Sequence, residues 1–101
     1  MPTYLASYDL KEAYPDPHPI FLKHAVNHGW RLWILSSENV WYRLPNTTLE
    51  GTFTDLQAAV SPLEATRATT ERELGRVVTM SKWIVADYGS ARFNSDERRN
   101  A

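Results

Sequence analysis

The stretch WRLWILSSENVWYRL, residues 30–44, decides how the rest of the chain can fold. Its two halves, residues 30–36 and 39–44, are rich in aromatic and branched aliphatic side chains, and the polar pair Ser37-Glu38 separates them. Two such runs around a short polar break are typical of a β-hairpin. Pro45 ends the second run because its ring removes a backbone donor. We therefore expect an antiparallel hairpin over these residues.

Alternation along the two strands predicts one face rich in tryptophan and arginine. Side chains two residues apart on a strand share a face. We expect Val40, Tyr42 and Leu44 to face helices. The open face then carries the other large and basic side chains of the hairpin, Arg31, Trp33, Trp41 and Arg43. A two-layer fold leaves one sheet face uncovered, so large aromatic side chains there indicate a partner.

Two partners suit this face, and a helix covering it is a third alternative. A second copy of the chain would bury the aromatic side chains in a symmetric interface. Single-stranded RNA or DNA would stack its bases on the indoles and pair its phosphates with the arginines. The near-neutral charge of the chain and the leucines of the hairpin favour the homodimer.

The segment before the hairpin predicts a strand and then a helix. Residues 3–10, TYLASYDL, alternate in size and are rich in tyrosine and leucine, as strands are. Three prolines within residues 14–19 end this strand, and Asp16 before Pro17 is a favourable helix start. Apolar residues at helical spacing continue to Gly29, which can end the helix in the left-handed conformation.

The segment after the hairpin predicts helices with a break. Residues 52–55 have the pattern of a helix cap, and Ser61-Pro62 is a second start signal. We therefore expect a broken or kinked helix there. Residues 70–73 repeat the capping pattern, but Gly75 disfavours a helix by up to about 1 kcal/mol. Residues 76–80 are alternatively an extra strand.

The last apolar run and the order of elements predict the fold class. Residues 83–88, WIVADY, have the composition of a buried strand, whereas residues 89–101 are polar and lack apolar periodicity. The order is then β-α-β-β-α-β, which fits an α+β fold of the ferredoxin-like, split βαβ type. We expect an antiparallel sheet with its helices on one face, a single domain over residues 1–88, and a flexible C-terminal tail over residues 89–101.

Composition limits the classes of function. A chain of 101 residues, 43% of them hydrophobic, has room for one core. The absence of cysteine excludes disulfides, thiolate zinc sites and cysteine nucleophiles. We find no apolar stretch of membrane-spanning length and no basic segment of a signal peptide, so we expect a cytoplasmic protein without a membrane partner. The formal charge of −1 leaves room for a local basic patch only.

Two short motifs resemble those of a known group of proteins. Tyr4-Leu5-Ala6-Ser7-Tyr8-Asp9-Leu10 is similar to the first strand of the small CRISPR-associated Cas2-like proteins and their VapD-type toxin relatives, and the segment LSSENVW, residues 35–41, is similar to their hairpin. The resemblance covers roughly residues 3–44, and the stretch 45–81 is longer and more helical than in that group. It implies a ferredoxin-like fold, a homodimer, and a metal-dependent nuclease that uses the Asp at the end of the first strand.

Asp9 is the residue that the resemblance places in that catalytic, metal-binding role. Two such acids across a dimer axis would hold one Mg²⁺ or Mn²⁺, since hard cations take carboxylate and water ligands. The alternative is that Asp9 begins a turn and accepts local backbone hydrogen bonds. His24 and His28 have the spacing of a two-histidine metal pair, but no third ligand accompanies them, which favours a solvated helix face.

Two functional hypotheses follow. The first is a small homodimeric interaction or regulatory domain without a cofactor. The second is a metal-dependent endoribonuclease or nucleic-acid-binding protein, with Asp9 as metal ligand and the Trp/Arg face as the contact to RNA or DNA. The surroundings of Asp9 and of the hairpin distinguish the two.

Overall fold

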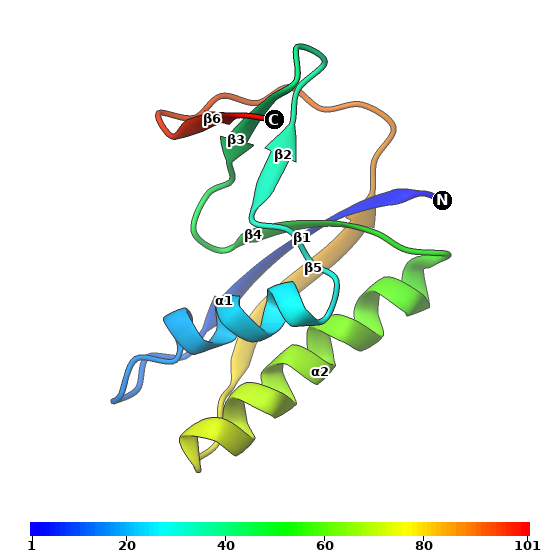
Figure 1. The fold of residues 1–101 in the computed structure, drawn as a ribbon. Coiled ribbons are helices and arrows are strands. Elements are labelled where there is room, and N and C mark those ends of the chain that lie inside the picture. Colours follow the sequence, from blue (N-terminus) through cyan, green and yellow to red (C-terminus); the bar gives the residue numbers. More distant parts are fainter.

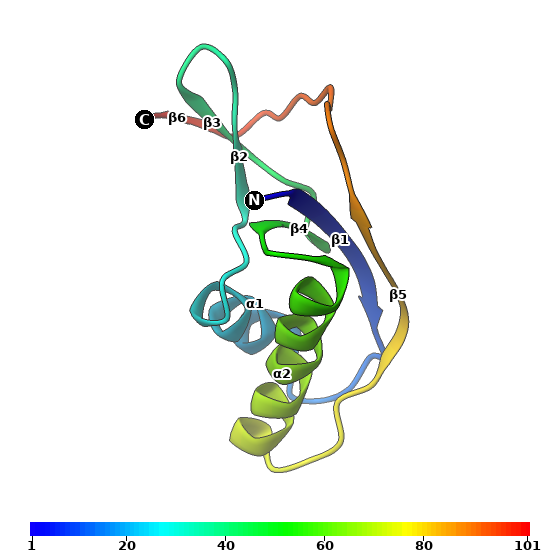
Figure 2. The ribbon, with the colours of Figure 1, turned by 90° about the vertical axis from the view of Figure 1, so that its right-hand side faces the viewer.

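Two helices lie on one face of a three-stranded antiparallel sheet, and a second three-stranded sheet extends beyond them (Figures 1 and 2). The computed structural model describes all residues 1–101. In chain order the elements are β1 (Thr3–Leu10), α1 (His18–Asn27), β2 (Trp33–Leu35), β3 (Val40–Arg43), β4 (Thr48–Thr52), α2 (Leu56–Leu74), β5 (Met80–Asp87) and β6 (Arg98–Asn100). The first sheet has the order β4-β1-β5 and the second β2-β3-β6.

Strand β1 runs through the middle of the first sheet, and its alternation sets the two faces. The even-numbered side chains, Tyr4, Ala6, Tyr8 and Leu10, are buried, whereas Ser7 and Asp9 are exposed. The buried set packs on the helices to form the core, with Phe21 and Ala25 of α1 and Ala59 and Leu63 of α2. The predicted strand is therefore confirmed.

Helix α1 begins one residue after the predicted start, with Pro17 rather than Asp16 at the N-cap, and it ends just before Gly29 as predicted. The carboxylate of Asp16 accepts a hydrogen bond of 3.0 Å from the backbone N–H of His18, which satisfies one free donor of the first turn. Gly29 has φ 99°, a left-handed conformation that glycine adopts at low cost. The backbone N–H of Trp30 then donates to the carbonyl of Ala25 at 3.0 Å. Trp30 is thereby delivered into the core, where it is fully buried.

The predicted break in the second helical region is wrong: α2 is one continuous helix. It begins after Asp55, whose carboxylate accepts from the backbone N–H of Ala58 at 2.8 Å. Pro62 lies inside the helix, where it removes one backbone bond. Burial of Leu63 one residue later offsets that loss, since tertiary packing supplies most helix stability in proteins. Gly75, with φ 69°, ends the helix rather than weakening its middle.

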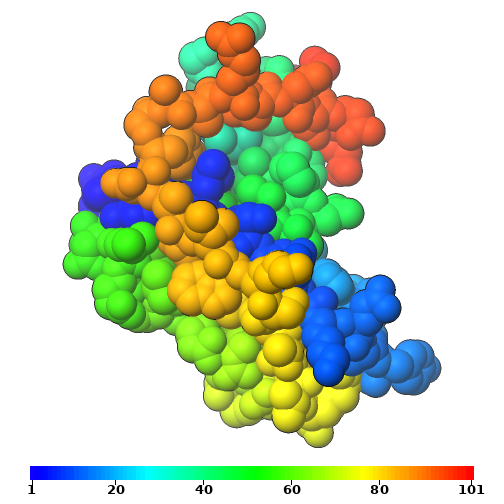
Figure 3. Space-filling view, turned by 180° about the vertical axis from the view of Figure 1, so that it is seen from behind, coloured from blue at the N-terminus to red at the C-terminus, as the bar shows by residue number.

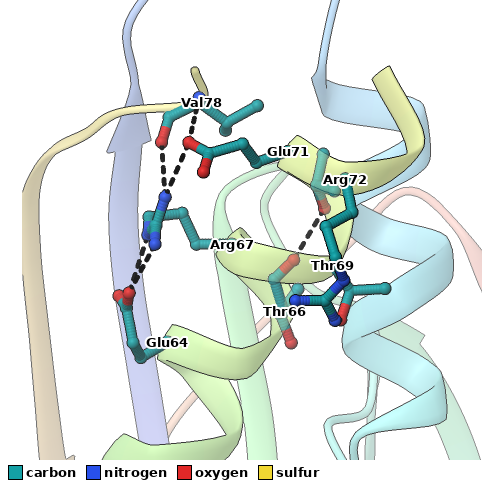
Figure 4. Close-up of polar contacts among 8 residues, drawn as sticks. Glu64, Thr66, Arg67, Thr69, Glu71, Arg72 and Val78 are labelled. Atoms are coloured by element: carbon teal, nitrogen blue, oxygen red, sulfur yellow. Dashed lines mark hydrogen bonds and ion pairs between the residues drawn. The ribbon is translucent and has the colours of Figure 1, made fainter. Parts of the chain in front are cut away.

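An arginine on α2 fixes the connection to β5. Arg67 binds Glu64 and Glu71 on its own helix and donates to the backbone carbonyl of Val78 at 3.2 Å (Figure 4). Glu71 accepts from the backbone N–H of Val78 at 3.0 Å, so both sides of that residue are held. Residues 76–79 are therefore a connection clamped to α2, and the extra strand considered for residues 76–80 is not formed as such.

The hairpin forms as expected but does not belong to the helix-covered sheet. Its register pairs Trp33 with Arg43 and Leu35 with Trp41. The two sheets are joined at one isolated bridge, in which Arg31 and Glu50 exchange backbone hydrogen bonds of 2.6 and 3.0 Å. The α+β class with antiparallel pairing and helices on one face is thus confirmed, whereas the sheet is split into two.

Part of the predicted tail takes regular structure. Within residues 89–101, strand β6 pairs with β3, and the backbone N–H of Arg43 donates to the carbonyl of Glu97 at 3.0 Å. Phe93 packs edge-on against Tyr42 with ring centroids 5.4 Å apart. The flexibility of residues 89–101 stays a prediction. None of the helices is both long enough and apolar enough to cross a membrane.

The buried hydroxyl of Tyr8 supplies a prediction about stability. It has no hydrogen-bond partner, and burial raises its pKa to about 12. Burial disfavours the ionised phenol, so the neutral Tyr8 side chain makes its full contribution to stability below pH 10. This contribution is lost as the pH rises toward about 12. Tyr8→Phe removes the unsatisfied group, so we expect a gain of about 1 kcal/mol at neutral pH and a smaller loss in alkali. Thermal melts at neutral and alkaline pH check this. A variant less stable than the parent at neutral pH would contradict it.

Candidate functional site

The structure brings together three of the four side chains predicted for the Trp/Arg face. Trp33, Trp41 and Arg43 lie on one face of the second sheet, as the register requires. Arg31 lies outside that strand, because it precedes β2 and is held by Glu50. The prediction that the hairpin packs its Val40, Tyr42 and Leu44 face on the helices is wrong. The second sheet, to which the hairpin belongs, lies beyond both helices (Figure 2).

The two tryptophans are less exposed than the sequence indicates. Both are half-buried. The guanidinium of Arg99, from β6, lies 4.4 Å from the ring centroid of Trp33, a cation–π geometry. Strand β6 also places Arg99 opposite Trp41. The C-terminal segment, which the sequence left as a tail, therefore completes this face.

A groove of about 280 Å³ lies between this face and the end of α1. It is lined mostly by apolar and aromatic side chains, which are Val26, Trp30, Leu32, Trp33 and Trp41, together with Arg31 and Arg99. The indole N–H of Trp30 is buried and has no acceptor. The groove can therefore take a flat apolar group and place an anion beside it.

A larger and more polar hollow, of about 820 Å³, lies on the other side of the hairpin. The hairpin loop, residues 35–38, and the segment 88–93 form its sides. Glu50 and Tyr88 also line it. Tyr42 borders it and lies beneath the guanidinium of Arg98, at 5.3 Å from the ring centroid.

Glu50 is a buried carboxylate at the junction of the two sheets. Its Oε1 accepts from Nε and Nη2 of Arg31, at 3.0 and 2.9 Å, in a forked arrangement. Its Oε2 accepts from the hydroxyl of Tyr88. Burial, and then the hydrogen bond to Glu50, raises the pKa of Tyr88. The same arginine donates to the hydroxyl of Thr52 at 3.1 Å. This cluster is a clamp between the sheets, and none of its buried side-chain nitrogen or oxygen atoms lacks a partner.

The feature that the sequence did not predict is the exposure of β5. This strand pairs only with β1, so its other edge is free. Trp83 is 49% exposed and Ile84 63% exposed, although the run WIVADY predicts a buried strand. Figure 3 views the molecule from the side opposite the helices, and the yellow-to-orange atoms of β5 lie uncovered there. An exposed apolar strand at a sheet edge is a site for strand pairing.

Asp9 lies on the uncovered face of the first sheet, opposite Lys82 of β5 in the register. Its side chain is exposed and makes no hydrogen bond in its own turn, so the turn-capping alternative is not what the structure has. No group of three or more histidine, cysteine, aspartate or glutamate side chains is placed to hold a metal ion. The metal-binding role of Asp9 therefore stays a prediction based on resemblance.

The two helical histidines bind neighbouring side chains on α2. His24 Nε2 lies 2.9 Å from Glu73 Oε1, and Lys23 binds the same oxygen at 3.2 Å. These two hydrogen bonds lower the pKa of Glu73. His28 Nε2 lies 3.3 Å from the hydroxyl of Thr69. The pair thus ties α1 to α2, and the prediction of a solvated helix face is wrong, because both imidazoles lie against α2.

Comparison with known proteins gives no match: no family model, no curated protein and no solved structure corresponds to the chain. The resemblance to Cas2-like and VapD-type proteins remains a prediction, and the geometry alone supports the function proposed next.

Proposed function

We propose that the chain is a homodimeric interaction module in which β5 of one copy pairs with β5 of a second copy. The observation that supports this proposal most directly is the free edge of β5, a strand of eight residues with Trp83 and Ile84 exposed. Natural proteins protect such edges with proline, with several charges or with a covering element. Strand β5 contains no proline, and Lys82 and Asp87 are its only charged residues.

The backbone of β5 is oriented for this pairing. The N–H of Tyr88 donates to the carbonyl of Thr3 at 3.1 Å, beside the pair formed by Tyr4 and Asp87. Hydrogen-bonded and non-bonded pairs alternate along an antiparallel ladder. The even-numbered residues of β5 therefore bond β1, and the odd-numbered ones, including Trp83 and Val85, direct N–H and C=O outward.

The sequence of β5 is self-complementary in one antiparallel register. A two-fold axis at Ile84 places this residue opposite its copy, and it places Trp83 opposite Val85 of the partner. Aromatic and β-branched side chains in facing positions are favourable cross-strand pairs. Lys82 then faces Ala86 of the partner, so no like charges are opposed. An isologous contact of this kind closes after two copies.

The solution mass tests the proposal. A single chain has a mass of 11.6 kDa, so light scattering coupled to size exclusion should give twice that value at micromolar concentration. Cross-strand protection of the Trp83 and Val85 amides from hydrogen exchange should accompany it. A mass equal to one chain across the whole concentration range would overturn the proposal.

This dimer separates the two Asp9 side chains. Between them lie β5 and the partner's β5, so the two β1 strands are three strand spacings, about 14 Å, apart. Carboxylate oxygens bind Mg²⁺ at about 2.1 Å, so two Asp9 residues at that separation do not share one ion. The endoribonuclease alternative therefore requires a different interface, and mapping the dimer distinguishes the two hypotheses.

The arrangement of the first sheet supports a ferredoxin-like fold, which we propose together with the dimer. In the split βαβ arrangement, the strand after the first helix is parallel to the first strand and separated from it by one antiparallel strand. The segment at Arg31 meets this condition, since it pairs antiparallel with β4, which pairs antiparallel with β1. The second sheet is then an insertion that extends from that strand.

A further inference from the structure

Three arginines lie on the second sheet. Arg43, Arg98 and Arg99 belong to β3 and β6, and none of them forms an ion pair. Arg43 donates to the backbone carbonyls of Leu32 and Leu44 at 3.3 and 3.1 Å. Asp96 and Glu97 line a hollow together with Arg43, whereas the groove that Arg99 lines has no acidic side chain, so local positive charge lies at that groove on a chain whose formal charge is −1. Such a site favours an anionic ligand.

The charged groups on one face of this sheet are interleaved with flat aromatic rings. Arg99 lies over the ring of Trp33 and opposite Trp41 in the register. Arg43 lies opposite Trp33 on the other side of the hairpin. Trp33 and Trp41 thus lie on this face together with Arg99, which offers indole surface for stacking and a donor for phosphate.

The groove beside these indoles is lined mostly by apolar and aromatic side chains. Trp30 lies in the lining with its indole Nε1 buried from solvent, and Val26 of α1, which is half exposed, lines the groove as well. No acidic side chain lines the groove. A ligand with a planar ring and an adjoining negative charge is complementary to these groups.

We infer that the groove binds one unpaired base of a single-stranded nucleic acid. The base stacks on the indole of Trp41, and Arg99 pairs with the adjoining phosphate. An acidic peptide offers the charge but lacks planar rings at successive positions, so the interleaved indoles favour nucleic acid. The site lies on the second sheet, and this inference is independent of the pairing proposed for β5.

Fluorescence anisotropy of a labelled oligouridylate of about 12 nucleotides, at about 20 mM salt, tests the inference. Saturable binding is expected with the parent chain. Arg99→Gln should weaken it and lower the slope of log K against log salt by about 0.7, the value for one phosphate contact on a single strand. Trp41→Leu should weaken it about 5- to 150-fold, the range for one stacked base.

Matched controls separate this site from general attraction. Arg72→Gln removes the same charge from an exposed position on α2, and Tyr14→Leu removes an exposed aromatic ring from the connection between β1 and α1; both should bind like the parent. Circular dichroism melts verify that each variant is folded. No binding by the parent, equal loss in Arg72→Gln and Arg99→Gln, or equal displacement by polyglutamate would each overturn the inference, the last by showing an anion site without base stacking.

Discussion

Replacement of Ile84 by lysine should convert the dimer into single chains. The proposed two-fold axis passes beside this residue, so the substitution places two ammonium groups opposite one another at the centre of the pairing. Ile84 is 63% exposed in the isolated chain, so the same change should cost the monomer little stability. We expect the mass from light scattering to fall from two chains to one at micromolar concentration, with an unchanged circular dichroism spectrum.

Two controls assign that effect to the edge of β5. Val77→Lys makes the same chemical change at an exposed position in the connection before β5, and it should leave the dimer intact. Trp33→Glu changes the face of the second sheet that the sequence favours as the interface. If the dimer pairs through β5 instead, this variant should also have the mass of two chains. If Trp33→Glu is monomeric and Ile84→Lys remains dimeric, the interface lies on the second sheet and not at β5.

Local patterns predicted the elements whose partners are close in the sequence. The alternation of TYLASYDL predicted β1, and Asp16 and Gly29 predicted the ends of α1, one residue too early at its start. The hairpin followed from two β-rich runs around a polar break. In each case a hydrogen bond within a few residues, or the period of the apolar side chains, determines the structure. The start signal at Pro62 misled because burial of α2 outweighs one missing backbone bond.

The rest depends on contacts between distant segments. Glu50 lies in a polar stretch of the sequence, residues 46–51. In the structure it is buried at the junction of the two sheets, where Arg31 and Tyr88 both bind it. Arg99 joins the Trp33 ring from a segment with no apolar period. Composition predicted a buried β5, and the free edge became apparent only from the strand order. The unusually apolar run WIVA is the one signal that could have indicated a partner.

The clamp at Glu50 supports the second prediction of large effect. Its side chain is 8% exposed and that of Arg31 is 40% exposed. Loss of a fully buried partner costs about 3–5 kcal/mol, and the access of Arg31 to water reduces this figure. We therefore expect Glu50→Ala to lower the free energy of unfolding by about 2–3 kcal/mol. For a chain of this length the melting temperature falls by about 10–20 °C.

The position of the loss distinguishes a clamp from an ordinary core residue. Arg31 and Tyr88 both lose their acceptor in Glu50→Ala, and the second sheet is joined to the first mainly through this cluster. Amides of β2 and β3 should therefore lose hydrogen-exchange protection before those of β1, since weakly attached elements open first. Glu50→Gln keeps the shape and one acceptor oxygen, which can serve Tyr88, but it loses the charge and the acceptor for Arg31, so its stability should fall between those of the parent and Glu50→Ala. Glu38→Ala, an exposed change at the hairpin loop, should melt with the parent. A Glu50→Ala protein that also melts with the parent, with uniform exchange across both sheets, would show that the backbone bridge alone holds the two sheets together.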